Sequence, residues 1–363
     1  MKKRWVMWIA AAGTAALVVG LGSAVAASRQ ATLTNVTLQL KWVPQAQFAG
    51  YYAAVKQGFY AKEGLNVTLK NGGPDIIPEQ VVASNQAQFG VDWLPSLLAA
   101  RDKGTQLVNI AQVVARSGMT QLTWKSSGIN TIAKMKGKKV ANWLGGNQWE
   151  LFAALQKNGI NPNNTKDITI VQQPFNMDLF LKHEVDSASA MTYNELAQVL
   201  ESGVKMSQIN VIRMQNVGTG MLEDGLFSTQ SYVSNPANSK TIVAFIKGSL
   251  EGWIYCRDHM AACVQDTLAY GPTLPKGHQT WMMNEMNKLI WPNASGIGIM
   301  SKADYQRTAT ISKQFKVISK PPTAGAYTTK FAAQAVAELK ASGVDVYGKS
   351  WKAPTVPISP GGK

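Results

Sequence analysis

Short β-type runs alternate with helical runs over much of the chain, and this alternation limits the fold more than any other feature of the sequence. The β-type runs lie at residues 36–40, 66–70, 88–91, 107–114, 139–142, 168–171 and 211–214. The helical candidates lie between them, at residues 50–63, 78–84, 94–103, 148–157, 177–182 and 194–201. Strands that alternate with helices are typical of α/β proteins, whose sheets are largely parallel.

From about residue 235 the pattern changes, and apolar residues recur at the three- and four-residue spacing of helices. Ile242, Phe245 and Leu250 mark one long amphipathic helix, and Phe331 and Leu339 mark another. A chain of 363 residues is too long for one ordinary hydrophobic core. We therefore expect two α/β lobes with additional helices.

The chain is expected to cross between the lobes twice. Residues 121–125 followed by Ser-Ser-Gly are interpreted as a crossing strand and turn, and residues 216–226, with three glycines, as the return. A ligand is then expected in the cleft between the lobes, facing the C-terminal ends of the strands. The expected segments are 27–124 for the first lobe, 125–218 for the second, 219–345 for a mainly helical return, and 346–363 for a flexible tail.

The first residues have the features of a secretory signal peptide. A positive start, Met-Lys-Lys-Arg, precedes an apolar run at residues 6–22 and a cleavage-type sequence that ends at Ala26. An uncleaved membrane anchor is the alternative, but the run is barely long enough to span a bilayer. We therefore expect residues 1–26 to be removed, and the mature protein to be periplasmic or otherwise extracytoplasmic without stable membrane insertion.

The formal net charge of +15 raises the question of nucleic-acid binding. The lysines and arginines are thinly spread, however, and only residues 134–139 form a basic cluster, which lacks a nucleic-acid-binding motif. We expect this cluster to be a solvated surface and expect no nucleic-acid partner. Attraction to an anionic membrane surface or an acidic partner stays open.

Two cysteines, Cys256 and Cys263, are separated by seven positions. On one continuous helix their Cα atoms would be about 10.5 Å apart, which is too far for a disulfide. A helix break at Asp258 and His259 would allow the sulfur atoms to meet. Because exported thiols so close in sequence are usually oxidised, we expect a Cys256–Cys263 disulfide.

Residues for catalysis or metal binding do not occur in recognisable patterns. The three histidines, His183, His259 and His278, lie far apart in the sequence and outside any zinc-binding spacing. No GxSxG nucleophile elbow occurs, and Asp224 is interpreted as an ordinary turn residue. We therefore expect no catalytic residue, no metal and no cofactor.

Aromatic residues recur at the ends of the predicted strands. Trp42, Trp93, Trp143 and Tyr193 all lie at or just after such ends. Core packing explains any one of them, but four equivalent positions favour a shared aromatic cleft that stacks on a flat ring. Tyr51, in the helix after the first strand, is a further candidate, and ordinary helix packing is its alternative explanation.

Two carboxylates at strand ends are candidates for hydrogen bonds to the edge of a bound ring. Asp92 follows the predicted strand at residues 88–91, and Glu195 follows Tyr193. Each can accept hydrogen bonds from a ligand. A role for Asp92 as a helix cap is the alternative.

Residues 142–150, "NWLGGNQWE", form a strand-to-helix turn that contains two glycines. Gly145 and Gly146 allow a tight turn, and Asn147 with Glu150 has the spacing of a helix capping box. Backbone N–H groups at such a helix start can bind a ligand oxygen, so Gly145, Gly146 and Asn147 are candidate ligand residues. An ordinary capped turn is the alternative.

Three segments of the chain resemble a known family: "LQLKWVPQAQFAGYYAAVKQGFYAKEGLNVTL", "QFGVDWLPSLLAA" and "VANWLGGNQWE". They are similar to the NMT1/THI5-like group of type II periplasmic binding proteins, and the similarity extends over residues 36–320. This resemblance implies an α/β fold with two lobes, each a mainly parallel sheet flanked by helices. The lobes close on a ligand, which is passed to an ABC transporter permease, and we expect a monomer.

The resemblance also implies a class of ligand. Exported members of the group carry riboflavin or thiamine pyrimidine precursors such as hydroxymethylpyrimidine and its formylamino analogue, and "GGPDI" at residues 72–76 looks most like these carriers. By this likeness Trp42 stacks on the ring, Asp92 contacts it from the first lobe, and Tyr193 and Glu195 face it from the second. A sensor domain, or a carrier of sulfonates or nitrile-type solutes on the same fold, is the alternative.

An enzyme branch of the group, the thiamine pyrimidine synthases, uses pyridoxal phosphate and iron. In that branch a lysine follows the strand end, and a histidine lies four residues further on. The matching positions here hold Asp92 and Ser96, and no cysteine-rich iron motif occurs near residues 190–200. The resemblance therefore favours a carrier over an enzyme.

Overall fold

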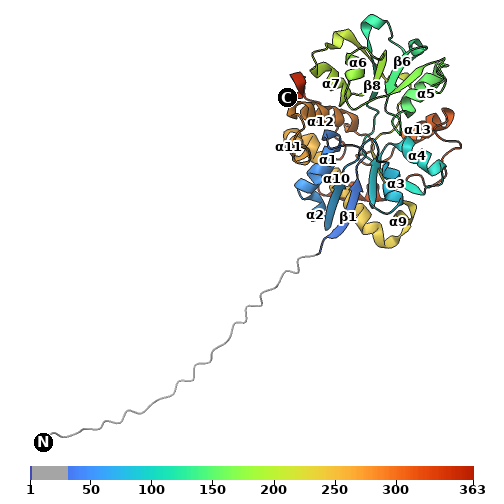
Figure 1. Ribbon diagram of the computed structural model, residues 1–363. Helices are drawn as coiled ribbons and strands as arrows, with labels where there is room; N and C mark the ends of the chain where they lie inside the picture. The colour runs from blue at the N-terminus through green and yellow to red at the C-terminus, as the bar shows by residue number, and fades with distance from the viewer. Residues whose placement is uncertain (2–31) are drawn as a thin grey trace. The chain divides into compact units, whose positions relative to one another are not determined.

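The computed structural model describes Met1 and residues 32–363 (Figure 1). The expected signal peptide therefore lies outside the described residues, apart from Met1. Across residues 32–363, every helix is too short or too polar to cross a membrane. The expected α/β class with two flanked sheets is confirmed.

The first sheet has five strands in the order β2-β1-β3-β10-β4. Strand β1 pairs in parallel with β2 and β3, while β10 pairs antiparallel with β3 and β4. The strands are β1 (Thr34–Gln39), β2 (Leu65–Lys70), β3 (Phe89–Asp92), β4 (Leu107–Gln112) and β10 (Gly225–Thr229).

The second sheet repeats this plan with the order β7-β6-β8-β5-β9. Strand β6 pairs in parallel with β7 and β8, and β5 pairs antiparallel with β8 and β9. The strands are β5 (Met119–Trp124), β6 (Lys139–Asn142), β7 (Thr169–Gln172), β8 (Ser187–Met191) and β9 (Ile209–Arg213). In both sheets the parallel strands therefore share one direction, and the single antiparallel strand occupies the fourth position.

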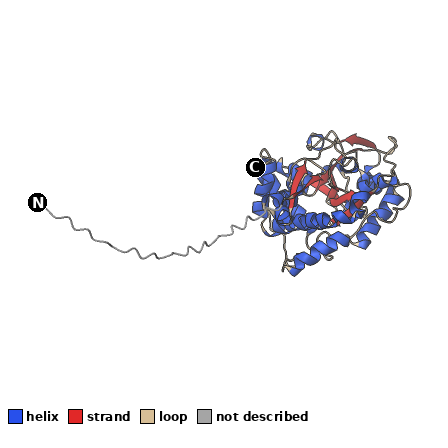
Figure 2. Ribbon diagram, turned by 90° about the horizontal axis from the view of Figure 1, so that it is seen from below, coloured by secondary structure: helices blue, strands red, loops and turns tan. Residues whose placement is uncertain are grey.

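Helices surround the strands of both sheets (Figure 2). Those before the return are α1 (Ala49–Lys56), α2 (Phe59–Lys62), α3 (Pro78–Ala83), α4 (Leu94–Asp102), α5 (Trp149–Lys157), α6 (Asp178–Leu181), α7 (Glu195–Glu201) and α8 (Met214–Val217). Those after it are α9 (Gln230–Ser234), α10 (Ser239–Asp258), α11 (Met260–Tyr270), α12 (Lys276–Ile290), α13 (Lys302–Gln314) and α14 (Lys330–Ala341).

The long helix α10 packs against α1 in the core of the first lobe. Its expected apolar stripe is buried, and Trp253 of α10 lies edge-on against Tyr51 of α1, with ring centroids 5.7 Å apart. Gly252 faces the carbonyl of Gly50 so closely that a side chain at position 252 would collide with it. This close approach explains why the helix tolerates glycine here despite its cost to helix stability.

The crossings between the lobes differ in detail from the expected ones. The segment interpreted as a crossing strand belongs to β5, which begins at Met119 inside the second sheet, six residues before the expected boundary. The return leads into β10, a strand that the sequence analysis did not identify. Strand β5 is rich in polar residues, but these are satisfied inside the sheet: the Thr120 hydroxyl donates to the Ala190 carbonyl, and Ser187 donates to Gln121, at 2.6 Å each.

The C-terminal segment expected to be a flexible tail has defined contacts instead. Val346 and Gly362 are buried, and the Asn284 amide of α12 donates a hydrogen bond of 3.1 Å to the Pro354 carbonyl. The chain ends beside α7 and α12 (Figure 1). Proline and glycine in this segment therefore mark an irregular backbone that is packed on the protein.

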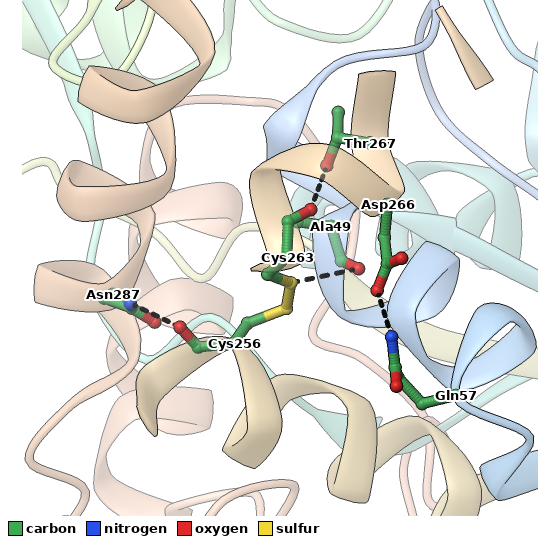
Figure 3. The surroundings of a disulfide bond; sticks show 7 residues. All are labelled: Ala49, Gln57, Cys256, Cys263, Asp266, Thr267 and Asn287. Carbon is green, nitrogen blue, oxygen red and sulfur yellow. Dashed lines mark hydrogen bonds between the residues drawn. A yellow bond between two sulfur atoms is a disulfide. The ribbon is translucent and has the colours of Figure 1, made fainter. Parts of the chain in front are cut away.

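The corner between α10 and α11 contains a disulfide between Cys256 and Cys263 (Figure 3). Helix α10 ends at Asp258 and α11 begins at Met260, so the two Cα atoms lie only 5.2 Å apart. Both cysteines are fully buried, and the Cys256 carbonyl accepts a hydrogen bond of 3.2 Å from Asn287 of α12. The disulfide therefore fixes a corner on which α12 also packs.

Candidate functional site

The C-terminal ends of parallel strands from both sheets meet at one cavity between the lobes. Strand β1 leads to Trp42, β3 ends at Asp92, β6 leads to Trp143, and β8 leads to Tyr193. The main space, which we call the outer cavity, has a volume of about 640 Å³. A smaller inner cavity of about 20 Å³ adjoins it and shares Lys41, Trp42, Trp143 and Asn147 with it.

Aromatic side chains from both lobes form the cavity walls. Trp42 of the first lobe is half-buried and lies edge-on to Phe175 of the second, with ring centroids 5.2 Å apart. Trp143 is buried, and its indole N–H donates to the Pro174 carbonyl at 3.2 Å, which fixes the ring. These walls can stack on a flat ring that enters between the lobes.

An ion pair between Lys41 and Asp92 lies in the first-lobe wall of the outer cavity. Both side chains are buried, and Asp92 also accepts the Trp93 backbone N–H at 2.6 Å. Burial lowers the pKa of Lys41, but the charges of Asp92 and Glu79 outweigh this effect and hold it above its usual value. Lys41 is therefore charged and is neutralised by Asp92.

Glu79, in the first turn of α3, is a second carboxyl in this wall. It is 4% exposed, and its Oε1 atom has no hydrogen-bond partner among the described residues. Burial raises the pKa of Glu79 well above its usual value; Asp92 raises it further, and Lys41 opposes the shift. The buried part of the first-lobe wall thus presents a lysine that is paired with Asp92 and a second carboxyl group, and Lys103 is an exposed cation at the same cavity.

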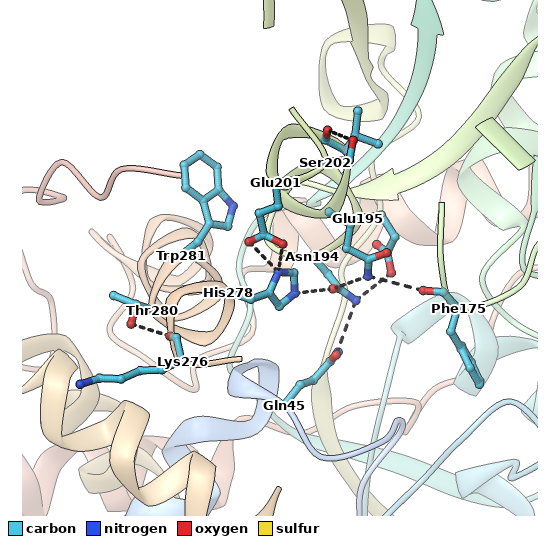
Figure 4. A network of polar contacts seen from close by, with 12 residues as sticks. Gln45, Phe175, Asn194, Glu195, Glu201, Ser202, Lys276, His278, Thr280 and Trp281 are labelled. Carbon is cyan, nitrogen blue, oxygen red and sulfur yellow. Dashed lines mark hydrogen bonds and ion pairs between the residues drawn. The ribbon is translucent and has the colours of Figure 1, made fainter. Parts of the chain in front are cut away.

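The second lobe contributes a polar network to the inner cavity (Figure 4). Glu195 accepts the Met191 backbone N–H at 2.9 Å and the Asn194 amide at 2.7 Å, and burial raises its pKa to about 7. Asn194 also reaches Gln45 of the first lobe at 3.5 Å. This network therefore connects the two lobes at the edge of the cavity.

The same network continues to α12, on the side of the first lobe. The two ring nitrogens of His278 lie 2.9 Å from the Asn194 amide oxygen and 2.9 Å from a carboxylate oxygen of Glu201 (Figure 4). Trp281, one turn further along α12, donates to the Thr192 carbonyl at 3.2 Å. Helix α12 is thus joined to the loop and helix that follow β8.

Most of the predicted ligand residues lie at these cavities. The outer cavity contains Trp42, Asp92, Gly145, Gly146 and Asn147. The inner cavity contains Trp42, Asn147, Tyr193 and Glu195.

Two predicted ligand residues, Tyr51 and Trp93, lie away from both cavities and are corrected here. Each is 1% exposed. Tyr51 packs against Trp253 between α1 and α10, and Trp93 lies beneath Lys41, whose Nζ is 5.5 Å from the Trp93 ring centroid. Both rings face inward because the backbone turns there into a helix that covers the sheet, so they contribute to the core.

The expected capping box of Asn147 and Glu150 does not form. Helix α5 starts at Trp149, and its N-cap residue, Gln148, makes no side-chain cap hydrogen bond within residues 32–363. The Gly146 N–H is taken by the Gln148 side chain at 2.8 Å, so it is not free for a ligand. Glu150 instead accepts hydrogen bonds from the Ser117 hydroxyl at 2.7 Å and the Met221 N–H at 2.8 Å.

Ser117 and Met221 lie in the two segments that connect the lobes, so Glu150 bridges both crossings. Glu223 extends this link by accepting the Gly118 N–H at 2.8 Å. Burial raises the pKa of Glu150 to about 8 and that of Glu223 well above its usual value. Asp224, interpreted from sequence as a turn residue, is buried and accepts the Gln47 amide at 2.7 Å; burial raises its pKa to about 6.

Several cavity residues were missed by the sequence analysis, namely Lys41, Glu79, Ser96, Gln173 and Phe175. Lys41 had an available signal, since it directly precedes Trp42 at a strand end. Glu79 had none, because an acidic residue in the first turn of a helix is common without any ligand. Phe175 is half exposed at the cavity rim, and its contact with Trp42 depends on how the two lobes face each other.

Within the described part of the chain, no group of three or more histidine, cysteine, aspartate or glutamate side chains is arranged to hold a metal ion. The side chains present at the cavities offer aromatic stacking and hydrogen bonding. Such side chains can stack on a ring and form hydrogen bonds with polar groups.

Comparison with known proteins identifies relatives with named ligands. The riboflavin-binding protein RibY of Chloroflexus aurantiacus is 24% identical over 235 residues, which are 63% of this chain and 64% of that protein. The match thus spans slightly less than two thirds of that relative. The formylaminopyrimidine-binding protein of Halalkalibacterium halodurans is 32% identical over 88 residues, 24% of this chain and 27% of that protein.

Solved structures share the fold at low sequence identity. The alkanesulfonate-binding protein SsuA of Xanthomonas axonopodis pv. citri, bound to MOPS, superposes with a TM-score of 0.63 at 16% identity. The superposition covers 82% of this chain and 98% of that protein, which supports a periplasmic-binding-protein fold and carries no information on the ligand. The sequence profile described as NMT1/THI5 like matches residues 45–262, well over half of the chain. The chain therefore belongs to the NMT1/THI5-like family.

Proposed function

We propose that this protein is the extracytoplasmic solute-binding component of an ABC importer and that it captures a flat nitrogen heterocycle between its lobes. The observation that carries the proposal is a cavity with aromatic walls from both lobes, in which the buried lysine of the first lobe is already paired with Asp92. Stacking on Trp42 and Trp143 provides affinity for a ring. The buried polar groups provide specificity at the ring edge.

The charges of the cavity favour a heterocycle over an anionic solute such as a sulfonate. Lys41, the buried cation of the wall, is already paired with Asp92. A bound sulfonate would also lie near the carboxyls of Glu79 and Glu195, both of which are buried. An unpaired anion in a buried site is costly, so this arrangement disfavours it.

The two relatives narrow the proposed class of ligand. One is named for riboflavin and the other for formylaminopyrimidine, and both ligands are flat nitrogen heterocycles. We infer that riboflavin or a thiamine pyrimidine precursor, such as hydroxymethylpyrimidine or its formylamino analogue, is the solute of this protein. Trp42, Asp92, Gly145, Asn147, Tyr193 and Glu195 are its proposed contact residues. Gly146 is proposed to contact the solute without its N–H group, which Gln148 already accepts.

A carrier function is also consistent with Asp92 and Ser96, which occupy the positions of the lysine and the histidine of the synthase branch. Asp92 is engaged with Lys41, and the Ser96 hydroxyl donates to the Gly146 carbonyl of the second lobe at 3.1 Å. Asp92 has no amine to form a Schiff base with pyridoxal phosphate, and Ser96 has no imidazole. The proposal is therefore a non-enzymatic carrier, exported by a cleavable signal peptide.

Titration of the purified mature protein, followed by tryptophan fluorescence, tests this proposal. We expect saturable quenching with riboflavin or with one of the two pyrimidines, because Trp42 and Trp143 lie at the cavity. An alkanesulfonate and nitrate serve as anionic comparison solutes. Tight binding of an anion with no response to any heterocycle would overturn the proposed ligand class.

A further inference from the structure

Glu79 lies at a point of the outer cavity where a ligand would meet the first lobe. It belongs to the first turn of α3 and lies beside Asp92, at the end of β3, and Lys41, which follows β1. Lys41, Asp92 and Glu79 therefore form one buried cluster in the cavity wall. Sequence analysis and the family resemblance assigned no role to Glu79.

One oxygen of this cluster is unsatisfied. Lys41 donates to Asp92, and Asp92 also accepts the Trp93 N–H. The Oε1 atom of Glu79, by contrast, has no hydrogen-bond partner within residues 32–363, although the side chain is only 4% exposed. An unsatisfied buried polar atom is costly, and buried carboxyl oxygens in proteins nearly always accept a hydrogen bond.

A stabilising role at the start of α3 does not explain this side chain. Acidic residues near a helix N-terminus gain most when they are charged or accept a backbone N–H. Burial and Asp92 raise the pKa of Glu79, and α3 has no side-chain cap hydrogen bond in the described part of the chain. Glu79 lines the outer cavity, so a donor on a molecule bound there would satisfy its carboxyl group.

We propose that the Glu79 carboxyl selects the ligand by accepting a hydrogen bond from an N–H group on the edge of the bound ring. The inference rests on the proposed function and specifies the chemistry of the solute. The ring must carry an amino group or an unsubstituted ring N–H. An aminopyrimidine and the pyrimidinedione ring of a flavin both meet this requirement, and a sulfonate does not.

Two variants separate hydrogen bonding from space filling. In Glu79→Gln the amide oxygen still accepts a hydrogen bond, and in Glu79→Met a side chain of similar length cannot. We expect Glu79→Gln to bind within about threefold of the parent, and Glu79→Met to bind about five- to tenfold more weakly, as for one lost hydrogen bond. The same pair of changes at Glu184, an exposed residue of the second lobe, is the control.

Ligand analogues give a second, independent measurement by isothermal titration calorimetry. Hydroxymethylpyrimidine is compared with its dimethylamino analogue, and riboflavin with 3-methylriboflavin, so that each pair differs only in its N–H group. We expect N-methylation to weaken binding to the parent protein by about tenfold, and to have much less effect on Glu79→Met. The pair that responds identifies which heterocycle supplies the N–H group.

Several results would overturn this inference. If the unmodified protein binds a ring and its N-methylated analogue with equal affinity, the inference is wrong, and no variant is needed to show it. N-methylation of the ligand could also weaken binding equally in the unmodified protein and in Glu79→Met. If circular dichroism shows that both proteins are folded, this result would overturn the inference as well. If the unmodified protein binds no heterocycle at all, the proposed function fails and this inference fails with it.

Discussion

Trp42 is the residue on which the stacking argument depends most. It lies at both cavities and is half-buried. Its edge-on neighbour, Phe175, belongs to the opposite lobe. We expect Trp42→Ala to weaken heterocycle binding by about tenfold or more, since one aromatic pair contributes about 1 kcal/mol beyond the area it buries. Calorimetric titration measures this loss.

The control for this change is Trp351→Ala, which removes a partly buried tryptophan in the C-terminal segment. We expect it to leave the affinity unchanged. Affinities of Trp42→Ala and the parent that agree within twofold would remove Trp42 from the site.

The buried Glu150 carboxyl makes the stability of the protein depend on pH. Burial raises its pKa from 4.5 to about 8. Between these values the folded protein keeps a proton that the unfolded chain releases, so the free energy of unfolding falls as the pH rises through this window. We expect Glu150→Gln, which cannot ionise, to reduce this fall by about 1 kcal/mol or more.

Urea denaturation at about pH 5 and about pH 8 measures this effect. Glu184→Gln, at an exposed carboxylate, is the control and should keep the pH dependence of the parent. The interpretation of Glu150 is wrong if its substitution leaves the difference between the two pH values unchanged.

At the residue scale, sequence reasoning identified residues that follow parallel strand ends, because these ends must face the ligand cleft. It therefore located Trp42, Asp92 and Tyr193 at the cavities. It could not distinguish a ring that faces the cleft from one that turns into the core, which is why Trp93 was misassigned. It also assigned Glu150 to a local capping box, because the true partners of Glu150 come from two distant crossing segments.

Helices α10 and α11 provide the clearest prediction at the element scale. Their disulfide closes a short loop, and the buried sulfur of Cys263 lies 3.6 Å from the Ala49 carbonyl of α1. We expect the double substitution Cys256→Ala and Cys263→Ala to lower the free energy of unfolding by about 2 kcal/mol. Ligand affinity should be unchanged, because neither cysteine lies at the cavities.

Denaturant unfolding with and without a thiol reductant measures the contribution of this bond. The reductant should destabilise the parent by a similar amount and leave the double variant unaffected. A reductant effect of equal size on both proteins would contradict the assignment.

The elements themselves were predictable wherever periodicity is strong. The strand at residues 139–142 and the long helix that contains Ile242 and Leu250 are both present. Strand β5 was interpreted as a crossing between the lobes because its sequence is polar. Strand β10 was missed because it directly follows a glycine-rich return. Their place in the sheets is set by pairing with strands distant in sequence, which local pattern does not report.

At the scale of the whole molecule, the network of Asn194, His278 and Glu201 is one of the contacts between the lobes. His278 of α12 bridges Asn194 and Glu201, and Asn194 also lies at the inner cavity. We expect His278→Ala to increase the rate of heterocycle dissociation several-fold, because the lost hydrogen bonds help to hold the lobes together. The association rate should change less.

Stopped-flow fluorescence measures both rates. Thr280→Ala, on the same helix, is the matched control, since the Thr280 hydroxyl bonds only to the carbonyl of Lys276 among the described residues. Unchanged dissociation from His278→Ala would show that this network does not contribute to ligand retention.

The central claim is that a flat nitrogen heterocycle binds between the two lobes. A crystal structure of the mature protein with riboflavin or hydroxymethylpyrimidine tests it most directly. We predict the ring in the outer cavity, stacked on Trp42, with an N–H group within hydrogen-bond distance of Glu79. A heterocycle bound outside this cavity, or an anion bound inside it against Lys41, would contradict the account.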